Sequence, residues 1–195
     1  ENSYYINGFP VTNPLTGFGA SQLPFGAIAE AQVLTGGFGA EFGRSIGGVV
    51  NVLTKSGKNR WEAGATMSWS PDSLRSDPKD IYYPKTGRTY NAATDGTLYI
   101  RRNQNTADSK LFGGYVSGPI IQDKLFMLVS AEQTKTDQGF VNGLRTSTSN
   151  AVNGWNDTKA TVNRYLAKFD WNIADEHRLE FMSIGDSPVV KIDRS

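Results

Sequence analysis

The sequence predicts a mostly β protein, in which a glycine-rich α+β region precedes an antiparallel sheet of about five long strands. Eleven of the 21 glycines lie in residues 1–57, and residues 1–43 contain no lysine or arginine. Beyond residue 58, apolar and polar side chains alternate with the period of two that is typical of strands. We therefore divide the chain into two regions, residues 1–57 and residues 58–195.

The composition excludes several classes of function. Cysteine is absent and His177 is the single histidine, which excludes a disulfide scaffold, a zinc ribbon, a thiol nucleophile and a double-histidine metalloprotease. Lysine plus arginine is 20 against 19 acidic residues, so we expect no nucleic-acid partner. No catalytic triad or acidic pair can be assembled, and we expect neither an enzyme nor a cofactor nor a metal site. No run of 18 apolar residues predicts a transmembrane helix.

The first region predicts short mixed elements. Asn7-Gly8 is a turn dipeptide because both residues tolerate positive φ. Pro24 can open a helix of about two weak turns that ends at Glu30. Short strands are expected over residues 3–6, 31–35 and 47–54.

The first strand of the second region has the length and pattern of a membrane-crossing strand. From Arg60 to Trp69 the odd positions are apolar and the even positions are mostly polar. A tilted strand that crosses a bilayer has about 9–11 residues. Trp61 and Trp69 at its two ends, together with Trp171, predict aromatic girdles that face lipid.

The connections between strands support the same interpretation. Strands are expected near residues 60–69, 110–118, 124–134, 159–171 and 177–185. The four connections contain about 40, 5, 24 and 5 residues, and outer-membrane barrels alternate long extracellular loops with short periplasmic turns in this way. Five strands cannot close a barrel, and an open edge cannot lie in lipid. We therefore expect the chain to be part of a longer protein, the start of a large transmembrane β-barrel.

Three segments resemble TonB-dependent outer-membrane transporters. Residues 36–57 resemble the end of the plug domain in that family, which commonly carries a Gly-Arg, a Gly-Gly and an apolar strand ending in Thr-Lys. Here these are Gly43-Arg44, Gly47-Gly48, Val49–Leu53 and Thr54-Lys55. Residues 5–11 are similar to the Val-Asp-Gly segment of the plug, with Asn7 in place of the usual aspartate. Residues 118–126 resemble the Gly-Pro-Ile-Ile-Lys-Asp-Lys-Leu-Phe phrase of the Oar-like branch, with Gln122 as a mild departure.

The resemblance implies a plug that is locked by charge pairs and released by force. It implies that residues 1–57 are the C-terminal half of a plug, and that Arg44 pairs with carboxylates, of which Glu41 is the nearest in sequence. The alternative is a solvated arginine on a turn. The glycines of the plug loop do not match a nucleotide-binding fingerprint, and we assign them to tight turns; they are Gly36, Gly37, Gly39, Gly43, Gly47 and Gly48.

The long connection after the first strand is rich in tyrosine and arginine, which favour recognition surfaces. Candidate contacts to an extracellular ligand are Tyr82, Tyr83, Tyr90, Tyr99, Arg101 and Arg102. The alternative is that these side chains pack against neighbouring loops.

The resemblance implies a Gram-negative outer membrane and passage of a bulky or scarce solute, energised by TonB. The expected partners are outer-membrane lipid, the TonB complex through a region outside this sequence, the transported ligand and possible surface proteins. Three alternatives stay open: a surface adhesion barrel, an outward secretion conduit and a soluble carbohydrate-binding β-sandwich.

Overall fold

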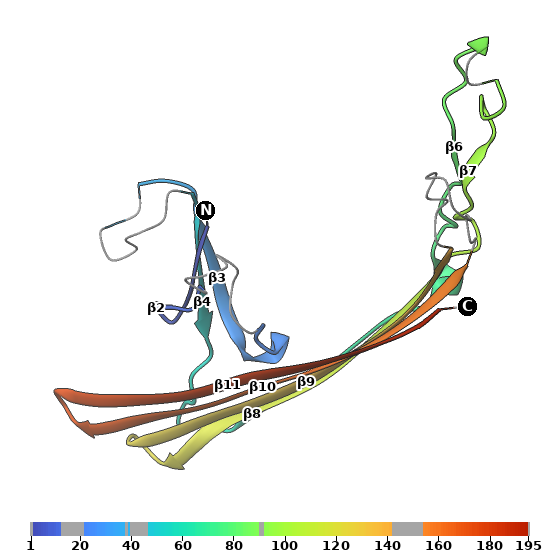
Figure 1. Cartoon of the computed structure of the whole chain (residues 1–195). Coiled ribbons are helices and arrows are strands. Elements are labelled where there is room, and N and C mark those ends of the chain that lie inside the picture. The colour runs from blue at the N-terminus through green and yellow to red at the C-terminus, as the bar shows by residue number, and fades with distance from the viewer. Residues whose placement is uncertain are drawn as a thin grey trace. The chain divides into compact units, whose positions relative to one another are not determined.

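The computed structural model describes residues 2–12, 22–37, 39, 47–89, 92–141 and 154–194. Within these residues the chain forms a four-stranded sheet, a five-stranded sheet and a two-stranded ribbon (Figure 1). This confirms the mostly β fold class. In the part of the chain that is described, no helix is long and apolar enough to span a membrane.

The four-stranded sheet, called here the N-terminal sheet, has the order β2-β1-β4-β3. Its strands are β1 (Ser3–Ile6), β2 (Phe9–Pro10), β3 (Ile28–Leu34) and β4 (Val49–Thr54). β1 pairs in parallel with β4, and β3 pairs antiparallel with β4. The turn between β1 and β2 has Asn7 at φ 49° and Gly8 at φ 80°, as the dipeptide predicts.

The prediction of a two-turn helix from Pro24 to Glu30 is wrong, because the helical segment is shorter. The structure has a single 3₁₀ turn at Phe25–Ala27, and β3 begins at Ile28. Two backbone interactions compete with the helix: Lys55 N donates to Ala27 O at 2.8 Å, and Ile28 pairs with Thr54 of β4. Sheet pairing therefore overrides a weak local preference for helix.

The five-stranded sheet, called here the wall sheet, has the order β11-β10-β9-β8-β5 (Figure 1). Its strands are β5 (Glu62–Ser70), β8 (Thr106–Ile121), β9 (Leu125–Val141), β10 (Trp155–Ala174) and β11 (His177–Arg194). The last four contain 16, 17, 20 and 18 residues and extend beyond the ranges expected from sequence. The extensions mix polar and apolar residues, for example Val189, Val190 and Ile192 in β11, so the period of two is weaker there.

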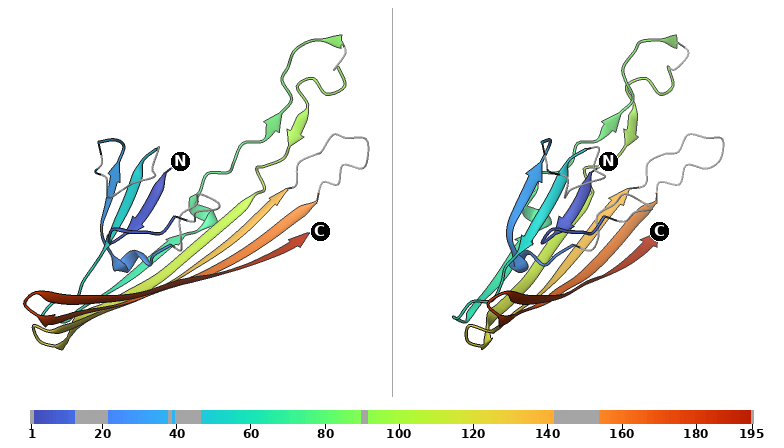
Figure 2. Two further views of the ribbon diagram at one scale, coloured as in Figure 1. Left: turned by 60° about the vertical axis from the view of Figure 1, so that its left-hand side comes forward. Right: turned by 90° about the vertical axis from the view of Figure 1, so that its left-hand side faces the viewer.

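The chain divides into two compact units. The first contains residues 1–67, 112–133 and 162–187, and the second contains residues 68–111, 134–161 and 188–195. The first unit therefore holds the N-terminal sheet and the strand segments next to the short turns. The second holds the strand segments next to the long connections and the ribbon of β6 (Ile81–Tyr82) and β7 (Leu98–Ile100) (Figure 2).

The wall sheet has two faces with opposite chemistry. Its inner face carries the even positions of β5, β9, β10 and β11 and the odd positions of β8, and its outer face carries the others. On β10 the inner residues Leu166, Lys168 and Asp170 are buried, whereas the outer residues Tyr165 and Trp171 are 50% and 46% exposed. In this part of β10, charged side chains are thus inside and aromatic side chains outside, the reverse of a soluble sheet.

Aromatic rings cover glycines on neighbouring strands within the first unit. A Cβ added to Gly118 or Gly185 would enter the ring of Trp61 or Tyr165 respectively, on the outer face. On the inner face, a Cβ added to Gly64 would enter the ring of Tyr115. These cross-strand pairs fix the register of the wall sheet because a ring fits only opposite the missing side chain.

Candidate docking site on the inner face of the wall sheet

The N-terminal segment contacts the inner face of the wall sheet through an apolar centre. Ala27, Leu128 and Leu166 are fully buried together, and four partly buried side chains surround them: Leu23, Tyr115, Met182 and Ile184. Ala27 comes from the 3₁₀ turn, which places a small side chain against two leucines of neighbouring wall strands. Polar contacts lie near this small cluster in the same unit.

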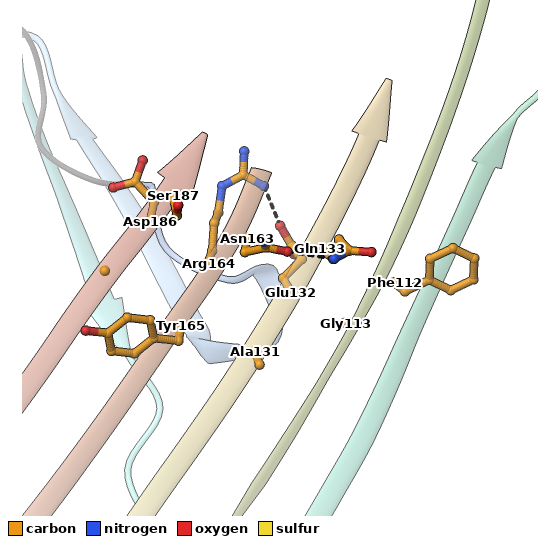
Figure 3. Close-up of a pocket in the computed structure, with 11 residues that line it drawn as sticks. Phe112, Gly113, Ala131, Glu132, Gln133, Asn163, Arg164, Tyr165, Asp186 and Ser187 are labelled. Carbon is orange, nitrogen blue, oxygen red and sulfur yellow. Dashed lines mark hydrogen bonds and ion pairs between the residues drawn. The ribbon is translucent and has the colours of Figure 1, made fainter. Parts of the chain in front are cut away.

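Glu132 of β9 is the first polar anchor of the docking site. Its Oε2 accepts a hydrogen bond from the Phe25 backbone N–H at 2.9 Å, and its Oε1 pairs with Arg164 Nη1 at 2.8 Å. Arg164 Nη2 donates in turn to Gln22 Oε1 at 2.7 Å. The two charged side chains are only 5% and 14% exposed. Figure 3 shows the pair among residues of β8 to β11 that line an open hollow of about 720 Å³. Most of these residues, such as Phe112 and Tyr165, belong to the outer face.

Lys168 of β10 is the second anchor and lies in a group of four charges. Its Nζ donates to Ser56 Oγ at 2.9 Å, just after β4. The same Nζ lies 3.3 Å from Glu180 Oε2 and 3.6 Å from Asp170 Oδ2. Arg178 Nη2 completes the group at 2.7 Å from Asp170 Oδ1. Each buried charge therefore has an opposite charge within reach, as burial requires.

Asn7 is the third anchor, and its left-handed backbone places the side chain between two partners. Its Nδ2 donates to Thr54 Oγ1 at 2.8 Å and to Glu180 Oε1 at 2.9 Å, while its Oδ1 accepts from Thr54 N at 2.8 Å. An aspartate at this position could not donate to Glu180. Asparagine in place of the aspartate usual in the similar family therefore has a physical reason in this chain.

The segment after β4 lies tightly against the wall sheet. Lys55 Nζ lies 3.9 Å above the Tyr115 ring centroid, which is cation–π distance. A Cβ added to Gly57 would lie 2.8 Å from Met127 O and 2.9 Å from Gly118 O. Both atoms belong to the backbone, so only glycine fits where the chain passes to the wall.

The chemistry of the site suits a contact that holds and then releases. The ion pairs of Glu132 and Lys168 join side chains within the wall sheet, so they stay paired when the N-terminal segment leaves. The segment itself contacts these side chains by hydrogen bonds, which water can replace on release. No group of three or more residues able to hold a metal ion occurs among the described residues.

Several residues expected from sequence lie outside the described residues. These are Arg44, Glu41, Gly43 and Tyr90. Of the described loop glycines, Gly37 has φ 68°, and a Cβ at Gly48 would meet Leu34 O at 3.3 Å. A Cβ at Gly36 would meet nothing within 4 Å. Gly39 is exposed and Gly47 is half-buried.

The loop candidates belong to the second unit. Tyr83 and Tyr99 pack edge to face with ring centroids 4.8 Å apart, and Tyr82 is exposed. Arg101 and Arg102 are exposed, and the Arg102 backbone N–H donates to Asp80 Oδ1 at 2.6 Å. One tyrosine pair therefore packs within the ribbon, which leaves Tyr82 and the two arginines toward solvent.

Two carboxylates of this loop accept hydrogen bonds from backbone N–H groups. Backbone N–H groups of Asn103 and Arg102 hold the pKa of Asp80 below its ordinary value of 3.8. Those of Thr86 and Gly87 do the same for the pKa of Asp95. In each case the hydrogen bonds favour the ionised carboxylate.

The three tryptophans expected at the lipid girdles are all exposed on the outer face or at its edge. Trp61, Trp69 and Trp171 are more than two-fifths exposed. Trp69 Nε1 donates to Asp108 Oδ2 at 2.9 Å. An indole with an apolar body exposed and its N–H bonded is typical of a membrane interface.

Sequence reasoning missed the residues that make the docking site. The sequence patterns assigned no role to Glu132, Arg164 and Lys168. The available signal was a set of charges at alternate positions in strands whose other positions are aromatic. In a soluble sheet that pattern marks a solvated face, and only the docked segment identifies it as buried.

A sheet with a charged, covered inner face and an aromatic outer face is typical of the outer-membrane transport proteins that carry a plug. No family model and no solved structure matches the chain. A curated protein of Myxococcus xanthus, TonB-dependent transporter Oar, is 34% identical over 128 residues. The aligned part covers 65% of this chain and 11% of that protein, so the chain spans a small part of the relative's length.

This match confirms the resemblance drawn from the motifs. Over these 128 residues the chain is similar to a TonB-dependent transporter, Oar-like.

Proposed function

We propose that residues 1–57 are the C-terminal half of a plug and that residues 58–195 begin the wall of a transmembrane β-barrel. The barrel lies in the outer membrane of a Gram-negative bacterium and admits a bulky or scarce solute, with TonB supplying the energy. The observation that carries the proposal is the inverted wall sheet. Lys168 and Asp170 are buried on its inner face, while Trp171 and Phe181 are 46% and 60% exposed on its outer face.

The contacts of the docking site must break during transport. The three anchors, Glu132, Lys168 and Asn7, hold the plug against the wall by hydrogen bonds. The ion pairs of Glu132 and Lys168 lie within the wall sheet and orient these anchors. We propose that TonB detaches the plug from these anchors, so that solute passes along the inner face. The free energy lost on release is recovered when the same pairs re-form.

Displacement of the plug can be followed at Ala27, which is fully buried in the apolar centre. In the full-length protein, the Ala27→Cys thiol should react with a maleimide in cells that contain TonB and stay unreactive in cells that lack TonB. Ser73→Cys, in the exposed turn after β5, is the matched control and should react in both strains. Equal reaction of Ala27→Cys in the two strains would rule out energised displacement and favour an adhesion barrel.

Arg44 and Glu41 are proposed as a further latch of the plug, on the resemblance alone. Arg44→Ala should make the plug easier to displace. Cells that carry this variant should become more sensitive to vancomycin, and the purified protein should show larger single-channel conductance. Unchanged values of both would remove Arg44 from the latch.

We further propose that Tyr82, Tyr90, Arg101 and Arg102 contact the transported ligand at the outer face, with Tyr83 and Tyr99 supporting the loop. Surface binding of a candidate ligand should fall in Arg101→Ala/Arg102→Ala and persist in Tyr83→Phe. Loss of binding in Tyr83→Phe alone would instead point to a direct contact by its hydroxyl.

A further inference from the structure

On the four long wall strands of the second unit, charge is almost confined to one face. Because side chains alternate between the faces of a strand, every lysine and aspartate there stands at an outer position. These residues are Asp108, Lys110, Lys135, Asp137, Asp157, Lys159, Lys191 and Asp193. Among the described residues of these segments, the inner positions carry one charge, Arg194 at the end of β11.

Hydroxyl and amide groups take the place of charge at the inner positions. They belong to Ser68, Ser70, Ser109, Thr134, Thr136, Gln138, Asn156 and Thr158. Ser109 and Thr136 are half-buried, whereas Lys135 on the other face is exposed. Over β5, β8, β9 and β10, the inner face of this unit is therefore polar without being charged.

Several of these groups have unused hydrogen-bonding capacity. Within the described residues, the side chains of Ser70, Ser109, Thr136 and Gln138 form no hydrogen bond. A hydroxyl can donate one hydrogen bond and accept others, and a side-chain amide can do both through separate atoms. Donors and acceptors are thus both available to a bound molecule.

The same four side chains line one hollow, called here the η3 hollow. It has a volume of about 440 Å³ and is lined by residues of β5, β8, β9 and the 3₁₀ turn η3 (Asp72–Leu74). The turn is fixed to the wall because Asp72 Oδ1 accepts a hydrogen bond from the Ala107 backbone N–H at 2.7 Å. Sites for small molecules have volumes of about 300–1,000 Å³. The η3 hollow therefore has the size of such a site and a wall that is held in place.

The remaining lining of the η3 hollow adds donors and one apolar contact. Arg75 is exposed and forms no ion pair within the described residues, so its guanidinium can donate to a ligand. Leu74 is 85% exposed and supplies an apolar side chain. The Asp108 carboxylate also lines the hollow, but Trp69 Nε1 and Lys110 Nζ engage it at 2.9 and 3.2 Å. The described lining thus contains no unpaired carboxylate.

We infer that the η3 hollow binds a saccharide unit of the transported solute. A sugar ring carries hydroxyl groups that donate and accept around its edge, and C–H groups on its two faces. The hydroxyl, amide and guanidinium groups of the hollow match the edge, and Leu74 matches a face. An ionic solute calls for charged side chains along the wall, and an extended peptide calls for pockets that receive its alternate side chains. The inference rests on the transport function proposed above and adds the substrate class and the residues that bind it.

The test compares two triple variants of the full-length protein in detergent. The hollow variant, Ser109→Ala/Thr136→Val/Gln138→Met, removes hydroxyl and amide groups from the η3 hollow and nearly keeps the side-chain volumes. The matched control, Ser183→Ala/Thr161→Val/Gln122→Met, makes the same three changes outside the hollow. The probes are printed arrays of neutral oligosaccharides, uronic-acid oligosaccharides and short peptides. Titration calorimetry then measures the Kd of the neutral oligosaccharide that gives the strongest signal.

We expect the wild type to bind at least one neutral oligosaccharide. The hollow variant should bind it roughly tenfold more weakly, because three hydrogen-bonding groups are lost, and the control should stay within about twofold of the wild type. Equal affinity of the hollow variant and the wild type would overturn the inference. So would a wild type that binds only uronic-acid oligosaccharides, only peptides, or nothing on the arrays.

The fold of the variants is checked by the thermal unfolding midpoint, which both triple variants should share with the wild type. The single variant Gln138→Met, at an exposed position, tests the same site with the smallest change and should weaken binding by about threefold. Unchanged binding by Gln138→Met together with a destabilised triple variant would count against the η3 hollow.

Failure of the transport function is seen in a different measurement. Saccharide binding in detergent requires no TonB, whereas the reaction of the Ala27→Cys thiol is expected to require it. Saccharide binding together with equal thiol reaction in both strains would keep the saccharide site and reject energised transport. TonB-dependent thiol reaction without saccharide binding would reject the saccharide site alone.

Discussion

The N-terminal sheet and the wall sheet bury opposite kinds of side chain. The N-terminal sheet buries Tyr5, Ile6 and Val49, as a soluble domain does. The wall sheet buries Glu132 and Lys168 and leaves rings and aliphatic side chains exposed on its outer face. In the strands of both sheets, successive side chains point to opposite faces. The difference teaches that the surroundings of a sheet, and not its strand propensity, decide which face carries charge.

The buried charges of the wall also show what covers the inner face. Each has a partner, either on a neighbouring strand or in the N-terminal segment, and the segment donates to Glu132 and accepts from Lys168. A wall that met only water on this face would need no such pairing. The following variants test the contrast between the two sheets, from the largest expected effect to the smallest.

Glu132→Ala should destabilise docking most, by roughly 3–5 kcal/mol, because it leaves the Arg164 guanidinium buried without its carboxylate. The thermal unfolding midpoint of the full-length protein in detergent measures the effect. Glu176→Ala, in the exposed turn between β10 and β11, is the control and should match the wild type. Adding Arg164→Leu to Glu132→Ala should recover part of the lost stability. Equal unfolding midpoints for Glu132→Ala and Glu176→Ala would remove Glu132 from the docking site.

Ala65→Arg and Thr66→Arg test which face of β5 meets lipid. Ala65 is exposed on the outer face and Thr66 is half-buried on the inner face. An arginine on the lipid side near mid-bilayer should cost about 2–4 kcal/mol of folding free energy, whereas one on the inner side should cost little. Folding into vesicles over a urea series measures both. Equal costs would contradict the outer-face assignment.

Gly57→Ala should destabilise by about 1–3 kcal/mol, because its methyl group would press on two backbone oxygens of the wall sheet. Gly36→Ala in the N-terminal segment is the matched change, since a Cβ there meets nothing within 4 Å. Its effect should lie within about 0.5 kcal/mol of zero. The urea midpoint separates the two, and a neutral Gly57→Ala would show that the chain passes the wall more loosely.

Acidification should have the smallest effect of these changes, and it should destabilise only the long loop. The pKa values of Asp80 and Asp95 lie below the ordinary 3.8, so their hydrogen bonds stabilise the loop fully above pH 3.8. The contribution is lost as the pH falls through the lower folded pKa values, because the unfolded loop binds the protons first. Hydrogen exchange at the Gly87 and Asn103 amides should rise only in that range. Asp80→Asn should remove the pH dependence at Asn103, and its persistence in that variant would assign the effect to another group.

Periodicity predicted the antiparallel strands, and the turn residues predicted where some of them meet. Asn7-Gly8 forms the expected turn, and β1 has the expected residues. The strand extensions were missed because polar and apolar residues mix there without a clear period of two. The helix after Pro24 was mistaken because the partner that competes for its backbone, β4, lies more than twenty residues away in sequence.

The sequence by itself determined the β class, the alternation of long and short connections and the two chemically different faces of each wall strand. These features depend on neighbours in the chain, and a period of two records them. Only the tertiary structure decided that the charged face is covered and which groups cover it. Phe25 N and Glu132 are separated by 107 residues, and Asn7 and Glu180 by 173. No local pattern encodes such pairs, because their free energy exists only after the segment has docked.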